Sequence, residues 1–220
     1  MTTLRPGPDP LVSEASLFSY LVTRPTGRAV RMGIEEQVAG CEGEVLTVLD
    51  FKDVAVIDYS CADEVVAELA FIAVRRPARL ETDPRGPRRR FVLIRGLEAH
   101  HQDPIDSALR RRELAVAAEL ADGQPVLLGA VDESEAHLWR LVCERERIGP
   151  EPLDGELGLP EGEARVRLDE LYRRRLLLRR AGEYISFRRV LFESAGRRER
   201  REPAPDRRGR RDTDTGRSSS

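Results

Sequence analysis

The stretch VLTVLDFKDVAVIDYSCADEVVAELAFIA, residues 45–73, decides the fold of this chain. It opens with an almost continuous apolar run, residues 45–51, which is typical of a strand buried on both faces. A second short run, residues 54–57, ends at Asp58. Beyond Ser60 the apolar residues 62, 65, 66, 69, 70 and 73 recur at helical spacing. The stretch therefore predicts a strand, a turn and a helix, with Ser60 as the N-cap of the helix and Asp63 and Glu64 in its first turn.

Part of this stretch, LDFKDVAVIDYSCADEV, resembles the LDFSGVxFIDSSGL segment of STAS domains, which include the anti-sigma-factor antagonists. The resemblance covers roughly the first half of the chain and is closest to an uncharacterised bacterial STAS-like group. It implies that Ser60 stands where the antagonists receive phosphate from a partner kinase, with Tyr59 in place of the family's first serine and Cys61 in place of its glycine. The implied partner-binding or phosphoacceptor residues are Asp58, Tyr59, Ser60, Cys61 and Asp63, and the implied partner is a serine kinase of the anti-sigma-factor type.

The composition limits the functions that the chain can have. With 220 residues, of which 40% are hydrophobic, the chain has room for two small domains. A net charge of −2 argues against binding nucleic acid through overall charge. Three widely spaced cysteines indicate neither a disulfide framework nor a zinc site, so we expect a reducing cytoplasm. No apolar stretch approaches the roughly 20 residues of a membrane span.

Strand and helix signals alternate in the first half of the chain, which predicts an α/β STAS-like domain over residues 15–132, a mixed sheet covered by helices. Residues 1–14 should be disordered, residues 16–22 and 91–94 should be strands, and residues 26–39 a helix. Residues 75–90, with seven arginines and three prolines, read as a basic loop. Asp103 and Pro104 should begin a helix that ends near Arg111. Residues 114–131 could continue that helix, but an Asp-Gly turn favours a hairpin.

The second half of the chain has helical patterns and resembles a winged-helix domain over residues 133–192. A first helix should end near Arg147, a short second helix should cover residues 153–157, and a third helix should cover residues 161–175. Residues 176–180 and 184–188 would be the two strands of the wing. The Arg-rich tail, residues 193–220, lacks apolar periodicity and should be disordered.

Candidate groups for chemistry are few, and we expect no enzyme, no cofactor and no metal. Ser60 can cap a helix or carry a phosphate at the helix N-terminus. Asp58 can bind amides in a turn, and Cys61 is either a reactive thiol or a buried one. His100 and His101 follow a strand, and on extended chain their side chains would point to opposite faces and form a poor metal pair. No phosphate-binding glycine loop is present in the sequence.

A basic strip is predicted at the end of the third winged-helix segment and along the wing. Residues 134–192 hold twelve arginines against eleven acidic residues, which argues against direct DNA recognition but leaves protein contacts open. The possible DNA-binding residues are Arg165, Arg173, Arg174, Arg175, Arg179 and Arg180. Our first hypothesis is a non-catalytic regulator that docks a protein partner. The alternatives are a DNA-binding transcription regulator and a small-ligand or nucleotide sensor.

Overall fold

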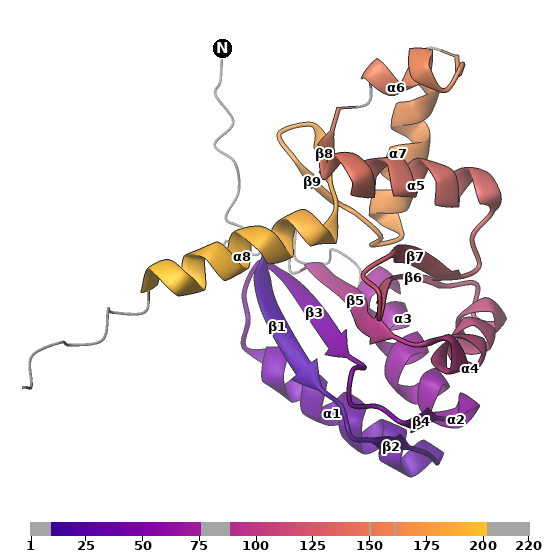
Figure 1. Ribbon diagram of the computed structural model, residues 1–220, viewed down its shortest axis with the longest axis vertical. Coiled ribbons are helices and arrows are strands. Elements are labelled where there is room, and N and C mark those ends of the chain that lie inside the picture. Colours follow the sequence, from indigo (N-terminus) through magenta and orange to yellow (C-terminus); the bar gives the residue numbers. More distant parts are fainter. Residues whose placement is uncertain (1–9, 76–88, 150, 161, 202–220) are drawn as a thin grey trace, which may run out of the picture.

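The apolar run that opens the deciding stretch forms strand β3 (Glu44–Asp50), which lies inside a five-stranded sheet (Figure 1). The structure is a computed structural model, and it describes residues 10–75, 89–149, 151–160 and 162–201. The strand order is β1 (Leu11–Ser16), β3, β5 (Arg89–Leu97), β6 (Ala115–Leu120) and β7 (Pro125–Gly129). The first four strands are parallel and β7 is antiparallel to β6, so the sheet is mixed.

Helices cover the first face of the sheet. These are α1 (Arg24–Ala39), α2 (Tyr59–Ala62), the π-helical segment η1 (Asp63–Ala67), α3 (Glu68–Arg75) and α4 (Ala99–Arg111). Their inner side chains form one core with residues that point to this face, such as Leu49, Ile94 and Val116. A two-stranded parallel sheet, β2 (Tyr20–Leu21) and β4 (Val56–Ile57), adjoins this layer and leads into α1 and α2. The prediction of an α/β layer with a helix-covered mixed sheet is therefore confirmed.

The second face of the sheet is covered by the C-terminal part of the chain. This part contains α5 (Glu133–Arg145), β8 (Arg147–Ile148), α6 (Glu151–Glu156), α7 (Glu163–Arg173), β9 (Leu178–Arg180), β10 (Glu183–Ile185) and α8 (Phe187–Arg201). β10 lies between β8 and β9 in a three-stranded antiparallel sheet. Leu46, Phe91 and Leu93 of the large sheet share a single core with Trp139, Leu168 and Phe187 from this part. The residues assigned to two domains from the sequence thus share one hydrophobic core.

The hairpin at residues 114–131 is confirmed by β6 and β7. Its four-residue loop has Gly123 at a positive φ of 85°, where an L side chain would be strained, and the amide of Gln124 donates to Asp122. The predicted short second helix, third helix and two wing strands correspond to α6, α7, β9 and β10. Each begins within two residues of its predicted start and ends within three of its predicted end.

Several predicted boundaries were wrong. β1 begins at Leu11, inside the segment expected to be disordered, because it pairs with β3 along its whole length. β5 begins at Arg89, inside the predicted basic loop; residues 76–88 of that loop lie outside the described residues. α8 continues to Arg201, past the expected start of the tail at residue 193, and its first turns are anchored by buried Phe187 and Val190. Residues 202–220 also lie outside the described part.

The helix expected at Asp103 begins earlier. α4 starts at Ala99 and holds Pro104 inside it. Its first turn is fixed by His101, whose Nδ1 accepts from the Glu98 amide and whose Nε2 contacts the Val54 carbonyl oxygen at 2.9 Å. Within the described residues, no helix is both long and apolar enough to cross a bilayer.

Candidate functional site

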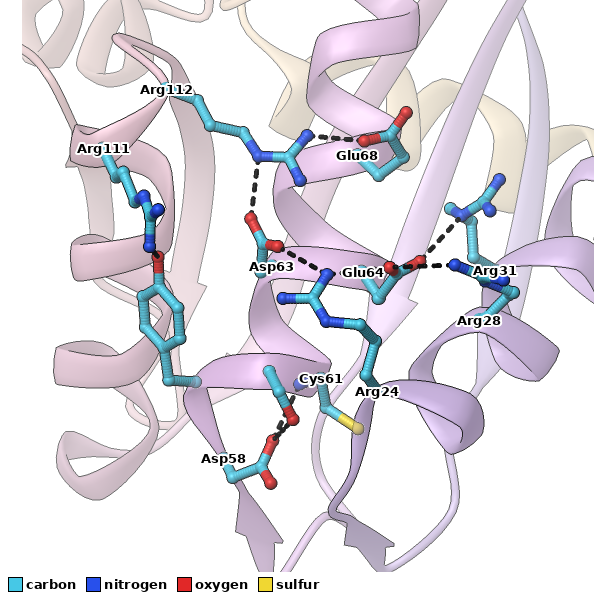
Figure 2. Close-up of polar contacts among 12 residues, drawn as sticks. Arg24, Arg28, Arg31, Asp58, Cys61, Asp63, Glu64, Glu68, Arg111 and Arg112 are labelled. Carbon is cyan, nitrogen blue, oxygen red and sulfur yellow. Dashed lines mark hydrogen bonds and ion pairs between the residues drawn. The ribbon is translucent and has the colours of Figure 1, made fainter.

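The turn between β4 and α2 is organised by Asp58, which is the N-cap of α2. Asp58 Oδ1 accepts hydrogen bonds from the Cys61 amide at 2.7 Å and from the Ser60 hydroxyl at 2.9 Å (Figure 2). Its Oδ2 accepts from the Thr23 amide at 3.0 Å. Burial opposes ionisation of this carboxyl group, but the hydrogen bonds outweigh it and hold the pKa of Asp58 below its ordinary value. The prediction that Ser60 caps the helix was wrong, because the carboxylate two residues earlier takes the capping position.

Ser60 and Tyr59, like Asp58, are half-buried. The Ser60 hydroxyl donates to the cap instead of accepting from the helix amides. The Tyr59 hydroxyl lies 3.4 Å from a guanidinium nitrogen of Arg111 on α4. Both side chains lie in the first turn of α2, but their hydroxyl groups have different partners, Asp58 for Ser60 and Arg111 for Tyr59.

Cys61 is buried beneath the turn, where α2 meets α1. Its thiol lies 3.0 Å from the carbonyl oxygen of Thr23, and burial raises its pKa. The two helices approach closely because Gly27 of α1 lacks a side chain: a Cβ there would lie 3.1 Å from Cys61 Cα and 2.9 Å from Glu64 Cβ. Of the two interpretations of Cys61, the structure agrees with a buried thiol, not a reactive thiolate.

Asp63 and Glu64 lie in η1 and are almost fully buried. Asp63 forms ion pairs with Arg24 of α1 at 3.0 Å and with Arg112 at 2.7 Å, while Arg24 also contacts Glu64 at 2.9 Å and Arg112 contacts Glu68 at 2.5 Å (Figure 2). Burial alone would raise the pKa of Asp63, but the two guanidinium groups lower it overall. Asp63 therefore joins α1, η1 and the end of α4, and does not present a free carboxylate to a partner.

The π-helical turn explains why two acids could be buried in succession. All five residues of η1 are buried, including both carboxylates. The Glu68 amide donates to the Asp63 carbonyl, five residues back. Such a widened turn is rare and leaves no mark in a helical apolar pattern. The sequence analysis placed these acids in the first turn of the helix, and the structure places them in η1, where both are buried.

An apolar surface lies next to the turn, and sequence reasoning missed it. It consists of Phe18, Tyr20, Val22 and Val56, with 69%, 66%, 39% and 43% of their surfaces exposed. Tyr20 of β2 and Val56 of β4 are directly paired. We call these four residues the β2 surface. The signal was available, because every residue from 17 to 22 except Ser19 is apolar or aromatic, so apolar side chains occur on both faces of the segment.

Most arginines of the predicted basic strip form ion pairs with acidic residues of the same chain. Arg173 pairs with Glu170 at 2.7 Å, Arg174 with Glu135 at 2.6 Å, and Arg179 with Asp169 at 2.8 Å. Arg180 lies 3.7 Å from Glu44.

Arg175 turns inward at a positive φ of 65°, donates to the Ala73 carbonyl and packs over the rings of Phe91 and Tyr172. Burial lowers its pKa. Of the six arginines proposed for DNA, Arg165 and Arg173 are the exposed ones. The strip therefore connects the C-terminal part to the sheet instead of forming a continuous cationic face.

His100 and His101 lie together in the first turn of α4, with ring centroids 3.9 Å apart, so the expectation of opposite faces was wrong. His101 is fully buried, and burial lowers its pKa with help from neighbouring His100. Both rings contact carbonyl oxygens of the segment before β4. In the described part of the chain, no three His, Cys, Asp or Glu side chains are arranged to hold a metal ion.

A cavity of about 600 Å³ lies between α1 and α3, over the middle of β3 and the start of β5. Its lining is mixed and includes Met32, Thr47, Ile72 and Val92. Arg90 also lines it, but its guanidinium donates to the carbonyl oxygens of residues 38 and 41 at 3.1 and 3.0 Å. The cavity has the size of a small-molecule site and holds few converging polar groups.

Comparison of the sequence with models of protein families and with curated proteins finds no match.

Proposed function

We propose that this chain is a non-catalytic regulatory protein of the STAS-like type, which docks a protein partner at the turn of residues 58–61 in a manner set by the charge on Ser60. The order of the C-terminal elements, helix, strand, two helices and two strands, supports a winged-helix-like arrangement of that part. Three free cysteines are compatible with a reducing cytoplasm.

The observation that carries the proposal is the connection from Ser60 through Asp58 to Thr23. The Ser60 hydroxyl and the Thr23 amide bind the two oxygens of the same carboxylate. A phosphate on Ser60, or an aspartate in its place, would put a second negative charge about 3 Å from Asp58, where like charges repel strongly. The carboxylate would then leave its position and release Thr23, which lies between the β2 surface and α1. One added charge would thus change the surface presented to a partner.

The test uses tagged protein to capture partners from the native cells, with and without nuclease, followed by mass spectrometry. Ser60→Asp and Ser60→Ala are compared with a matched control, Ser134→Asp. Ser134 has the same arrangement at α5: its hydroxyl lies 2.7 Å from the N-cap carboxylate of Asp132. We expect a protein that is retained by the wild type, by Ser60→Ala and by Ser134→Asp, and is lost from Ser60→Asp.

Two results would contradict the proposal. If Ser60→Asp and the wild type captured the same proteins, docking would not depend on the charge at residue 60. Recovery of nuclease-sensitive nucleic acid alone would favour the transcription regulator. That alternative has less support, because five of the six arginines proposed for it contact acids or carbonyl groups of the chain.

The cavity between α1 and α3 supports a second candidate, a small-ligand sensor, because its volume suits a small molecule. Mass spectrometry of the denatured purified protein would detect a retained compound. We expect the substitution Thr47→Phe, in the lining, to abolish its retention, whereas Ser60→Asp would not.

A further inference from the structure

The outer edge of β2 is open. β2 and β4 form a sheet of two strands, in which the carbonyl oxygens of Ser19 and Leu21 accept from the amides of Val56 and Asp58. Alternate residues of a strand direct their backbone groups to opposite edges. The amide and carbonyl groups of Tyr20 therefore point away from β4, and no further strand of the described residues pairs there.

This edge carries neither of the side-chain features that usually protect an exposed strand, although β2 is only two residues long and a short length also protects an edge. Edge strands in water usually carry charges or prolines. Residues 15–22 contain neither. Leu17 and Leu21 fill the core behind the strand, while Phe18, Tyr20 and Val22 remain exposed in front. A strand that is apolar on both faces is typical of one that is covered on both faces.

The edge is complementary to itself. In an antiparallel pair, two directly opposed residues exchange both backbone hydrogen bonds. Two copies related by a two-fold axis would place Tyr20 opposite Tyr20, so that the open amide of each meets the open carbonyl of the other. Because residues 15–22 carry no charge, the approach of a second copy meets no repulsion along the strand. The β2 surfaces of the two copies would then adjoin across the two-fold axis.

The exposed area indicates how stable such a pair can be. A buried aromatic side chain covers about 150–250 Å², and the two aromatic residues of the β2 surface are about two-thirds exposed. With the two valines, the surface offers on the order of 400 Å² per copy, about half of what a stable complex buries on each partner. The pair should therefore be weak and reversible.

We propose that a second copy of this chain pairs with β2 through the β2 surface and forms a weak two-fold dimer with Tyr20 at its axis. The inference does not depend on the proposed function, since it rests on a different surface. The two are linked in space, because Val56 stands two residues before Asp58 and Val22 directly precedes Thr23. A partner that covers the turn would compete with the second copy.

Sedimentation velocity of the full chain, up to about 1 mM, tests the proposal. Val56→Lys is compared with Val166→Lys, since Val166 is another exposed valine, on α7, with 59% of its surface accessible against 43% for Val56. We expect a concentration-dependent dimer whose dissociation constant rises at least tenfold in Val56→Lys and stays unchanged in Val166→Lys. In a Cys41→Ser background, Tyr20→Cys should form a disulfide-linked dimer on mild oxidation, whereas Met32→Cys on α1 should not.

A monomer at every concentration would overturn the proposal, as would a dimer that Val56→Lys leaves intact. A dimer that both lysine variants weaken equally would also exclude the β2 edge. Circular dichroism of each variant separates loss of pairing from loss of folding. Neither result depends on capture of a partner at Ser60, so failure of the dimer and failure of the proposed function are distinguishable.

Discussion

Replacing Gly27 by alanine tests the close packing of α1 against α2 and η1. The new methyl group would lie 2.9 Å from Glu64 Cβ and 3.1 Å from Cys61 Cα, closer than carbon atoms pack without displacement. Gly33 lies in the same helix with nothing within 4 Å of its Cβ position and serves as the control. The two substitutions are chemically identical and differ in their surroundings.

The expected free energies follow from this contrast. Gly33→Ala should stabilise the protein by about 0.5–1 kcal/mol, because alanine favours the helix. Gly27→Ala gains the same amount but forces the helices apart, which costs about 1–3 kcal/mol, so we expect a net destabilisation of up to about 2.5 kcal/mol. For a chain of 220 residues, each kcal/mol shifts Tm by about 2–4 °C.

Urea titrations followed by circular dichroism measure both variants against the wild type. Because Cys61 belongs to the turn that Asp58 caps, Gly27→Ala should also displace the turn and weaken capture of the partner. A Gly27→Ala protein as stable as Gly33→Ala would refute the packing of α1 on α2 described above. Unchanged urea midpoints for both variants would show that the helix contributes little to the unfolding transition.

Two further predictions concern buried titratable groups. Because burial lowers the pKa of His101, this residue binds a proton more readily in the unfolded chain than in the folded one. The contribution of neutral His101 to the free energy of unfolding should be fully present above its unfolded pKa of about 6.5. As the pH falls below that value, the free energy of unfolding should decrease by at most about 1.4 kcal/mol per pH unit. Urea titrations at pH 7.5 and 5.5 should show this loss in the wild type and in His137→Gln, where an exposed ring changes, but a smaller loss in His101→Gln. Burial raises the pKa of Cys61, and that of Cys143 to about 12, so a thiol reagent should modify Cys41 in the native protein and the other two only in denaturant. Equal labelling of all three thiols without denaturant would contradict the burial.

The elements of the fold were predictable from the sequence wherever local pattern and tertiary packing agree. The strand at residues 45–51 and the helix at residues 26–39 were predicted within two residues, because their apolar spacing matches the surfaces that they bury. The hairpin followed from its turn residues. The start of α4 could not be predicted, because it depends on contacts between His101 and the Val54 carbonyl, 47 residues away in the chain.

The candidate site was predictable in position but not in detail. The pattern located the turn at residues 58–61, and the structure assigns the cap to Asp58 because its carboxylate reaches the Cys61 amide and the distant Thr23 amide together. The burial of Asp63 depends on guanidinium groups from two other helices. Spacing along one helix cannot reveal such partners, so the sequence placed Asp63 in the first turn without indicating its burial.

The core shared by the large sheet and the C-terminal part has a consequence for how this protein could change in evolution. A segment that can be exchanged between proteins has to leave its neighbours intact when it is removed. Loss of residues 133–201 would expose Leu46, Val48, Phe91 and Leu93 to water along the middle of the sheet. The two halves are therefore expected to be inherited together, and a gene that kept the first half alone would need new polar residues at these positions or another chain to cover them.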